Sequence, residues 1–223
     1  MQHTGKNLDS FAITGQSLFT GKMSNMEPLA LDPGEYSGTY KLIGGRVSLD
    51  FINTISWPET RLQHDWLTTP ANVSAWLAAV GLATGPVSQG DIAEIQQIRR
   101  TLGEVLRPLA HGEWPSESAV GEFNQHIGWA QQRRFIDPVD LDWKWRTPTE
   151  GPHLLAPVIL DAADLMVESD HSRLRHCPSC DWIFEDQSRN GRRRWCDMAD
   201  CGSRAKARAY YERTKSQRSS NSM

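Results

Sequence analysis

Residues 177–215 read CPSCDWIFEDQSRNGRRRWCDMADCGSRAKARAYYERTK, and this stretch decides how the C-terminal part of the chain folds. It contains all four cysteines of the 223-residue protein, as a C-x2-C pair, a gap of fifteen residues and a C-x4-C pair. Two cysteines separated by two residues can direct both sulfurs at one point, and a second pair completes the tetrahedron that zinc prefers. The spacing therefore predicts a structural zinc site formed by Cys177, Cys180, Cys196 and Cys201.

Two disulfides or four unrelated buried thiols are the alternatives to a zinc site. The chain shows no signal peptide, so we expect a cytoplasmic, reducing compartment in which disulfides are disfavoured. Four thiolates leave no open coordination position, which argues for a structural rather than a catalytic zinc.

The residues between the cysteine pairs favour a compact finger. Trp182 to Phe184 suit a short strand, Asn190-Gly191 is a favoured tight turn, and Arg192 to Trp195 suit the returning strand. The alanine-rich and basic segment after Cys201 predicts a helix, with Asp200 as its cap. A cysteine knuckle, a hairpin and a helix together predict a treble-clef-like zinc finger, with a zinc ribbon as the alternative.

The charge of the chain is divided unevenly. Residues 171–223 hold twelve Lys and Arg against six Asp and Glu, a net charge of +6, whereas the whole chain holds 24 against 27. The remaining residues therefore carry −9. Such asymmetry indicates an anionic partner, most often nucleic acid, and the residues predicted to contact it are Arg189, Arg192, Arg193, Arg194, Arg204, Lys206 and Arg208.

These cations also have simpler interpretations. They can offset the net negative charge of a zinc ion bound by four thiolates, dock the finger against the acidic body, or form a solvated face. We favour nucleic-acid binding because twelve cations in so short a segment exceed what one metal site needs.

The C-terminal stretch resembles the CGNR zinc finger found at the C-terminus of bacterial proteins that carry an N-terminal ABATE domain. The matching residues are Cys177, Cys180, Trp182, Phe184, Asp186, Ser188, Arg189, Arg193 to Cys196, and Cys201 to Arg208, with Ser203 in place of the signature asparagine. Leu49-Asp50-Phe51 and Asn53-Thr54 resemble the opening motif of the ABATE domain. The resemblance, to a family regarded as stress-induced transcriptional regulators, implies a DNA-binding finger on a helical, sensory body.

The part of the chain before the finger predicts a mainly α-helical body with small β-hairpins. Helices are expected near residues 47–55, over 69–81, 88–111 and 154–168, and from Ser116 toward Trp129, with a hairpin within 133–148. The predicted domains are a flexible extension (1–34), the ABATE-like helical domain (35–170), the CGNR-type finger (171–216) and a disordered tail (217–223).

Asp50, Asn53 and Thr54 are polar residues among predicted core residues. They are candidates for a ligand pocket, although buried capping and core hydrogen bonds are the interpretation that we favour.

These features favour a zinc-dependent DNA-binding regulator over an RNA-binding protein or a protein-interaction module with a purely structural finger. No phosphate-binding loop, nucleophile elbow or metal-plus-base signature occurs, so we expect no enzymatic activity. No apolar run reaches the length of a membrane span. The expected partners are duplex DNA and a small-molecule effector of the body. We also expect a second copy of the chain, since one finger rarely provides enough contacts for specific binding.

Overall fold

A computed structural model describes residues 27–36, 38–57, 60–82, 84–146, 150–168 and 170–220. Most of the predicted N-terminal extension, residues 1–26, lies outside them. Residues 27–34, which the sequence assigned to the same extension, pack on the body. Leu31 is buried, the Leu29 N–H donates to the Tyr40 carbonyl at 2.8 Å, and the Asp32 N–H donates to Asn72 Oδ1 at 2.9 Å.

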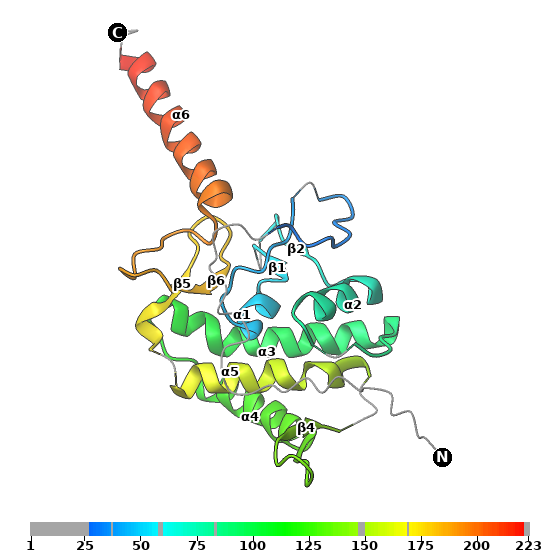
Figure 1. Cartoon of the computed structure of the whole chain (residues 1–223). Helices are drawn as coiled ribbons and strands as arrows, with labels where there is room; N and C mark the ends of the chain where they lie inside the picture. Colours follow the sequence, from blue (N-terminus) through cyan, green and yellow to red (C-terminus); the bar gives the residue numbers. More distant parts are fainter. Residues whose placement is uncertain are drawn as a thin grey trace.

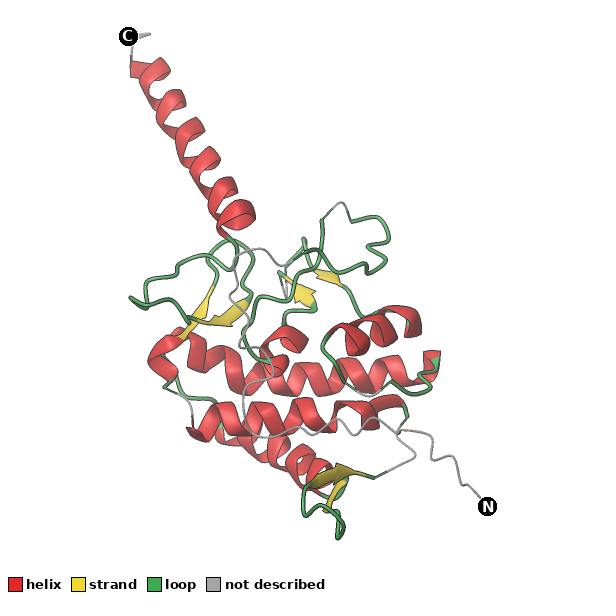
Figure 2. Cartoon of the chain, viewed as in Figure 1, coloured by secondary structure: helices red, strands yellow, loops and turns green. Residues whose placement is uncertain are grey.

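The described chain is mainly helical, as predicted (Figures 1 and 2). Its α-helices are α1 (Val47–Ile52), α2 (Pro70–Ala79), α3 (Ile92–His111), α4 (Glu117–Gln131), α5 (Ala156–Glu168) and α6 (Ser203–Ser220). Three antiparallel two-stranded sheets pair β1 (Ile55–Ser56) with β2 (His64–Asp65), β3 (Arg134–Ile136) with β4 (Trp143–Trp145), and β5 (Leu174–His176) with β6 (Ile183–Glu185). Among the described helices, none combines the length and the apolar character that crossing a bilayer requires.

The helix boundaries follow local signals in the sequence. The Thr69 side chain accepts a hydrogen bond from the Asn72 N–H at the start of α2, and Pro70 occupies the first position, where no N–H is needed. Ser88 and Asp91 form a capping box before α3. These helices were predictable because their first turns contain the groups that satisfy their own free N–H groups.

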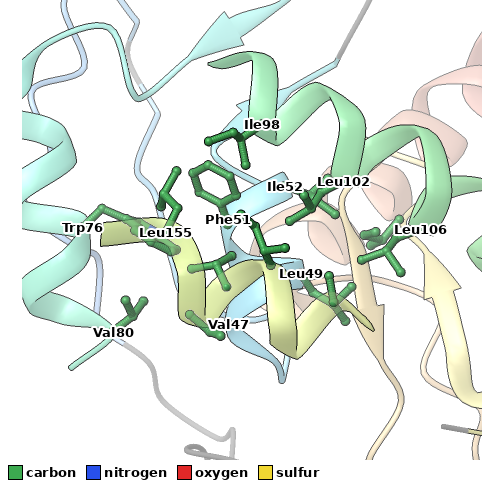
Figure 3. Close-up of a cluster of buried hydrophobic side chains, with 14 of the residues drawn as sticks. Val47, Leu49, Phe51, Ile52, Trp76, Val80, Ile98, Leu102, Leu106 and Leu155 are labelled. Atoms are coloured by element: carbon green, nitrogen blue, oxygen red, sulfur yellow. The ribbon is translucent and has the colours of Figure 1, made fainter. Parts of the chain in front are cut away.

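The core of the body forms around α3 and α1 (Figure 3). The predicted apolar stripe of α3 is buried along its whole length, at Ile92, Ile95, Ile98, Leu102, Val105 and Leu109. Helix α1 packs against both α3 and α5, and its Leu49 and Phe51 are fully buried. A six-residue helix is not stable alone in water, so α1 owes its stability to this burial.

The C-terminal segment packs directly on the body through the hairpin β5–β6. Asn53, at the end of α1, donates through Nδ2 to the Ile183 carbonyl at 2.8 Å and accepts from the Ile183 N–H through Oδ1 at 2.9 Å. Nearby, the Glu185 N–H donates to the Gly44 carbonyl at 2.8 Å. The side chain of Asn53 therefore satisfies both the N–H and the carbonyl of Ile183. In the described chain, β6 has no neighbouring strand other than β5.

Replacing Asn53 with alanine should destabilise the protein by about 3 kcal/mol, because two buried backbone groups of Ile183 lose their partners. Urea unfolding of the zinc-loaded chain measures this change. Asn190→Ala, at an exposed position, is the matched control and should lie within about 0.5 kcal/mol of the wild type. Equal stability of the two variants would contradict a structural role for Asn53.

Candidate metal centre and basic surface

Four buried cysteine sulfurs converge at the tip of the hairpin β5–β6. The Sγ atoms of Cys177, Cys180, Cys196 and Cys201 all lie within 4.8 Å of one another, and all four cysteines are free. The Sγ atoms of Cys180 and Cys196 are 3.5 Å apart, as are those of Cys196 and Cys201. Sulfurs bound to one zinc ion at about 2.3 Å would be separated by about 3.8 Å, so this donor set fits zinc, and disulfides are excluded.

The first pair of cysteines lies in the turn of a hairpin. Cys177 follows β5, and its N–H donates to the Trp182 carbonyl at 2.8 Å, while the Asp181 N–H donates back to the Cys177 carbonyl at 2.8 Å. Asp181 has a φ of 61°, in the left-handed region that tight turns use. The residues directly before Cys177 form β5, the partner of β6.

The segment around the second pair of cysteines differs from the prediction in three respects. Residues 192–195 do not form the returning strand, and Asn190 is not among the residues of positive φ, although Gly191 is, with a φ of 59°. The cap was also assigned to the wrong aspartate. Asp197, rather than Asp200, accepts a backbone hydrogen bond, from the Ala199 N–H at 2.8 Å, and begins a π-helical turn over Met198–Gly202 that contains Cys201 and continues into α6.

Asp186 explains why a loop replaces the predicted strand. Its buried carboxylate accepts from the Ser188 N–H at 2.9 Å and from the Arg193 N–H at 2.8 Å. Burial alone would raise the pKa of Asp186, but these hydrogen bonds to the charged form outweigh it and hold the pKa below its usual value. The carboxylate therefore bonds the backbone N–H groups of Ser188 and Arg193, at the two ends of the loop. In a hairpin, such N–H groups would instead bond to a neighbouring strand.

The crowded thiols favour a cation at their centre. Hydrogen bonding to Cys180 lowers the pKa of Cys177, whereas the same interaction raises the pKa of Cys180. One thiolate therefore forms at the expense of its neighbour as long as the sulfurs share protons. A divalent ion removes this competition, because thiolates that bind a metal are deprotonated together.

Two family models match the chain, one over the body and one over the finger. Residues 45–169 match the model of the ABATE family, described as "Putative stress-induced transcription regulator", and residues 173–214 match the CGNR zinc finger. The chain belongs to the ABATE family. No curated protein matched the sequence.

The departure of this chain from the CGNR signature has a local explanation. Ser203 stands where the signature has asparagine, and its Oγ donates to the Met198 carbonyl at 3.3 Å. The signature glycine is Gly202, where a Cβ atom would lie 2.5 Å from Met198 Sδ and 3.2 Å from Trp195 Cδ1. The finger thus retains the glycine that its tight packing needs, and serine still bonds within the turn.

The seven cations expected to contact nucleic acid differ in their surroundings. Six are exposed: Arg189, Arg192, Arg194, Arg204, Lys206 and Arg208. Arg204 is exposed and also lies against the metal centre, 3.2 Å from Cys201 Sγ and 3.4 Å from Asp200 Oδ1.

Arg193 is directed inward. Its guanidinium donates to the carbonyls of Trp195 and Cys196, and lies 4.3 Å from the centre of the Phe184 ring. It also reaches the Ile43 carbonyl, just before the ABATE match, at 3.5 Å. Arg193 therefore supports the finger and its docking, in contrast to the neighbouring Arg194.

Asp50, Asn53 and Thr54 are buried and hydrogen-bonded. Asp50 Oδ1 accepts from the N–H groups of Ile43 and Gly44 at 2.8 and 2.7 Å. Burial raises the pKa of the Asp50 carboxyl to about 7, because it outweighs these two hydrogen bonds, which lower the pKa. Thr54 Oγ1 donates to the Phe51 carbonyl at 2.7 Å. These contacts match the core hydrogen bonds that the sequence analysis favoured over a pocket.

A polar network behind Thr54 was missed from the sequence. Arg99, on α3, is 5% exposed and pairs through both terminal nitrogens with the carboxylate of Asp65, while Nη1 also donates to Thr54 Oγ1 at 2.8 Å. Arg99 lies beside the apolar stripe of α3, and helical periodicity alone gives no sign that its side chain is buried. The Lys41–Asp197 ion pair, at 2.6 Å between the domains, carried no local signal either.

Removal of the metal should unfold the finger, because so small a module has no sufficient core without its metal. We expect one zinc per chain by elemental analysis, and loss of the folded finger after treatment with a strong chelator, measured by circular dichroism and limited proteolysis. Cys201→Ala should lose the zinc, whereas Ser203→Ala, two residues away, should retain it. Zinc-free protein with an intact finger would refute the structural assignment.

Arg193→Ala should destabilise the zinc-loaded protein by about 2 kcal/mol, because a charged donor to buried carbonyls is removed. Arg194→Ala is the matched control, since its side chain is exposed and lies over the Trp195 ring at 5.0 Å. It should change stability by no more than about 0.5 kcal/mol. Urea unfolding of both variants makes the comparison, and the reverse order of stability would show that the two roles are exchanged.

Proposed function

We propose that this protein is a zinc-dependent transcription regulator that binds duplex DNA through the exposed cations of its finger and of helix α6. Membership in the ABATE family supports the regulatory part of this proposal. The observation that carries the DNA-binding part is the unusual setting of α6, which projects away from the rest of the chain (Figure 1).

Helix α6 lacks the features of a helix that packs on protein. Of its side chains from Ser203 to Lys215, all are exposed except Ala205 and Thr214, which are half-buried. It has no apolar stripe, and Tyr210 and Tyr211, 61% and 74% exposed, are its largest apolar residues. Most helices in proteins owe their stability to packing of an apolar face, and α6 lacks such a face, so a partner that orders it further is expected.

The charge of α6 indicates what that partner is. Residues 203–215 contain five cations, Arg204, Lys206, Arg208, Arg213 and Lys215, against the single carboxylate of Glu212. A helix of 18 residues is about 27 Å long and fits the major groove of B-DNA in width. Exposed arginines at the finger loop, Arg189, Arg192 and Arg194, supply further phosphate contacts.

Arg193 has no part in this proposed interface, because its guanidinium is bonded within the finger. RNA binding by the same surface is distinguished by strand preference, since exposed aromatic side chains such as Tyr210 and Tyr211 favour unpaired bases. The sequence-based expectation of a homodimer stays a prediction.

Lys206→Ala combined with Arg208→Ala should weaken binding to random duplex DNA and reduce the slope of log affinity against log salt by about two, one for each phosphate that is no longer neutralised. Fluorescence anisotropy of the zinc-loaded protein over a salt series measures both quantities. The charge-matched control is Arg134→Ala combined with Arg146→Ala, on and beside the β3–β4 hairpin at the far side of the body from α6 (Figure 1), and it should leave the slope unchanged.

Three results would count against the proposal. Absence of duplex binding at low salt would leave the finger as a structural or protein-docking element. Tighter binding to single-stranded RNA than to the duplex would move the function to RNA. Equal slopes for the two double variants would mean that α6 does not contact phosphates.

A further inference from the structure

A cleft on the body reaches the edge of the finger. It has a volume of about 940 Å³ and is lined mainly by α3 and the start of α4, with Asp181 of the cysteine knuckle at one side. Pockets that hold small organic ligands measure roughly 300–1,000 Å³. None of the four cysteines and none of Asp50, Asn53 and Thr54 lines it.

Gly103 forms part of the wall of this cleft in the middle of α3. A glycine inside a helix costs about 1 kcal/mol relative to alanine, so its presence needs a reason. Packing does not supply one, because a Cβ atom at this position would meet only the Arg107 side chain, at an ordinary 3.5 Å. The glycine instead leaves the cleft side of the helix backbone without a side chain, as at sites where a ligand approaches closely.

The charged groups around Gly103 are of both signs. Arg99 is neutralised by Asp65, and Arg107 donates to Asp181. Arg100 and Glu104, which also line the cleft, have no hydrogen-bond or ion-pair partner in the described part of the chain and do not pair with each other. Glu122, on the α4 side, accepts from Gln97 Nε2 at 3.2 Å and from Thr101 Oγ1 at 3.1 Å.

These groups restrict the chemistry of a ligand. An arginine fork such as that of Arg100 binds a phosphate through two parallel hydrogen bonds. The carboxylates of Glu104 and Glu122 accept hydrogen bonds only, so the same ligand must also offer hydroxyl or amino donors. We propose that the cleft binds an organic phosphate rich in hydroxyl groups, a nucleotide or a sugar phosphate, with the phosphate at Arg100 beside Gly103 and the hydroxyls toward the carboxylates.

The cleft is connected to the finger through Arg107. Its Nη1 donates to the Asp181 carbonyl at 2.9 Å and lies 3.1 Å from Asp181 Oδ2. Asp181 directly follows Cys180 and has the left-handed backbone of the knuckle. A ligand that engages Arg107 therefore acts on a residue that positions the metal centre, and, resting on the proposed function, its binding and DNA binding should affect each other reciprocally.

Isothermal titration of the zinc-loaded full chain, without DNA, tests the site with four probes: adenosine monophosphate, glucose 6-phosphate, adenosine and inorganic phosphate. We expect one of the two phosphate esters to bind at a single site, and adenosine and inorganic phosphate each to bind at least about tenfold more weakly. The two esters distinguish a nucleotide from a sugar phosphate. Failure of both esters to bind, or inorganic phosphate binding as tightly as either, would overturn the proposal.

Two variants locate the binding site. Gly103→Leu should place a side chain in the part of the cleft beside the proposed phosphate position and weaken ester binding at least about tenfold, whereas Gly128→Leu, at another mid-helix glycine with no atom within 4 Å of an added Cβ, should bind as the wild type does. Arg100→Ala, an exposed substitution that does not depend on leucine being accommodated, should also weaken binding of the phosphate esters but not of adenosine. Unchanged ester affinity in Arg100→Ala would exclude this cleft.

Because the titration contains no DNA, its failure leaves the proposed DNA binding untouched. The coupling is tested separately, by repeating the DNA anisotropy measurement with saturating ester. A changed DNA affinity supports the connection through Arg107, and an unchanged affinity overturns the connection.

Discussion

Four cysteine sulfurs within 4.8 Å of one another are the constraint on which the C-terminal finger depends. Buried thiols at this density compete for protons, and a divalent cation bound between them would remove that competition and join the two cysteine pairs. Cys177 and Cys180 belong to the hairpin β5–β6, and Cys196 and Cys201 to the loop and π-helical turn before α6. Helix α6 begins two residues after Cys201, so its position follows from this cysteine cluster, while most of its side chains from Ser203 to Lys215 are exposed.

The finger is joined to the body of the protein by polar contacts that are specific in geometry. Asn53 satisfies both backbone groups of Ile183, Trp182 Nε1 donates to Ser56 Oγ at 3.1 Å, and Lys41 pairs with Asp197. Polar groups buried at an interface are costly when they are separated, so these contacts favour one orientation of the two domains.

The arginines illustrate how burial sorts residues that look equivalent in sequence. Arg192, Arg193 and Arg194 are consecutive, yet the middle one bonds to carbonyls within the finger and its neighbours are exposed. Arg99 and Arg100 differ in the same way, since Arg99 completes a buried network with Asp65 and Arg100 is exposed at the cleft. A guanidinium provides five donors, so it can serve either as an internal brace or as an anion-binding group, depending on which acceptors surround it.

Local chemistry allowed the sequence alone to determine the clustering of the four cysteines, the main helices and the charge division of this protein. Cysteine spacing, the caps at Thr69 and Ser88 and the apolar stripe of α3 each act over a few residues, so they can be read without knowing the fold. The tertiary structure decided the pairing of β6 with β5 in place of residues 192–195, the inward direction of Arg193 and the cleft around Gly103. Each of these depends on partners distant in the chain, such as Ile43 for Arg193 and Asp181 for Arg107, and such contacts are formed only when the domains pack.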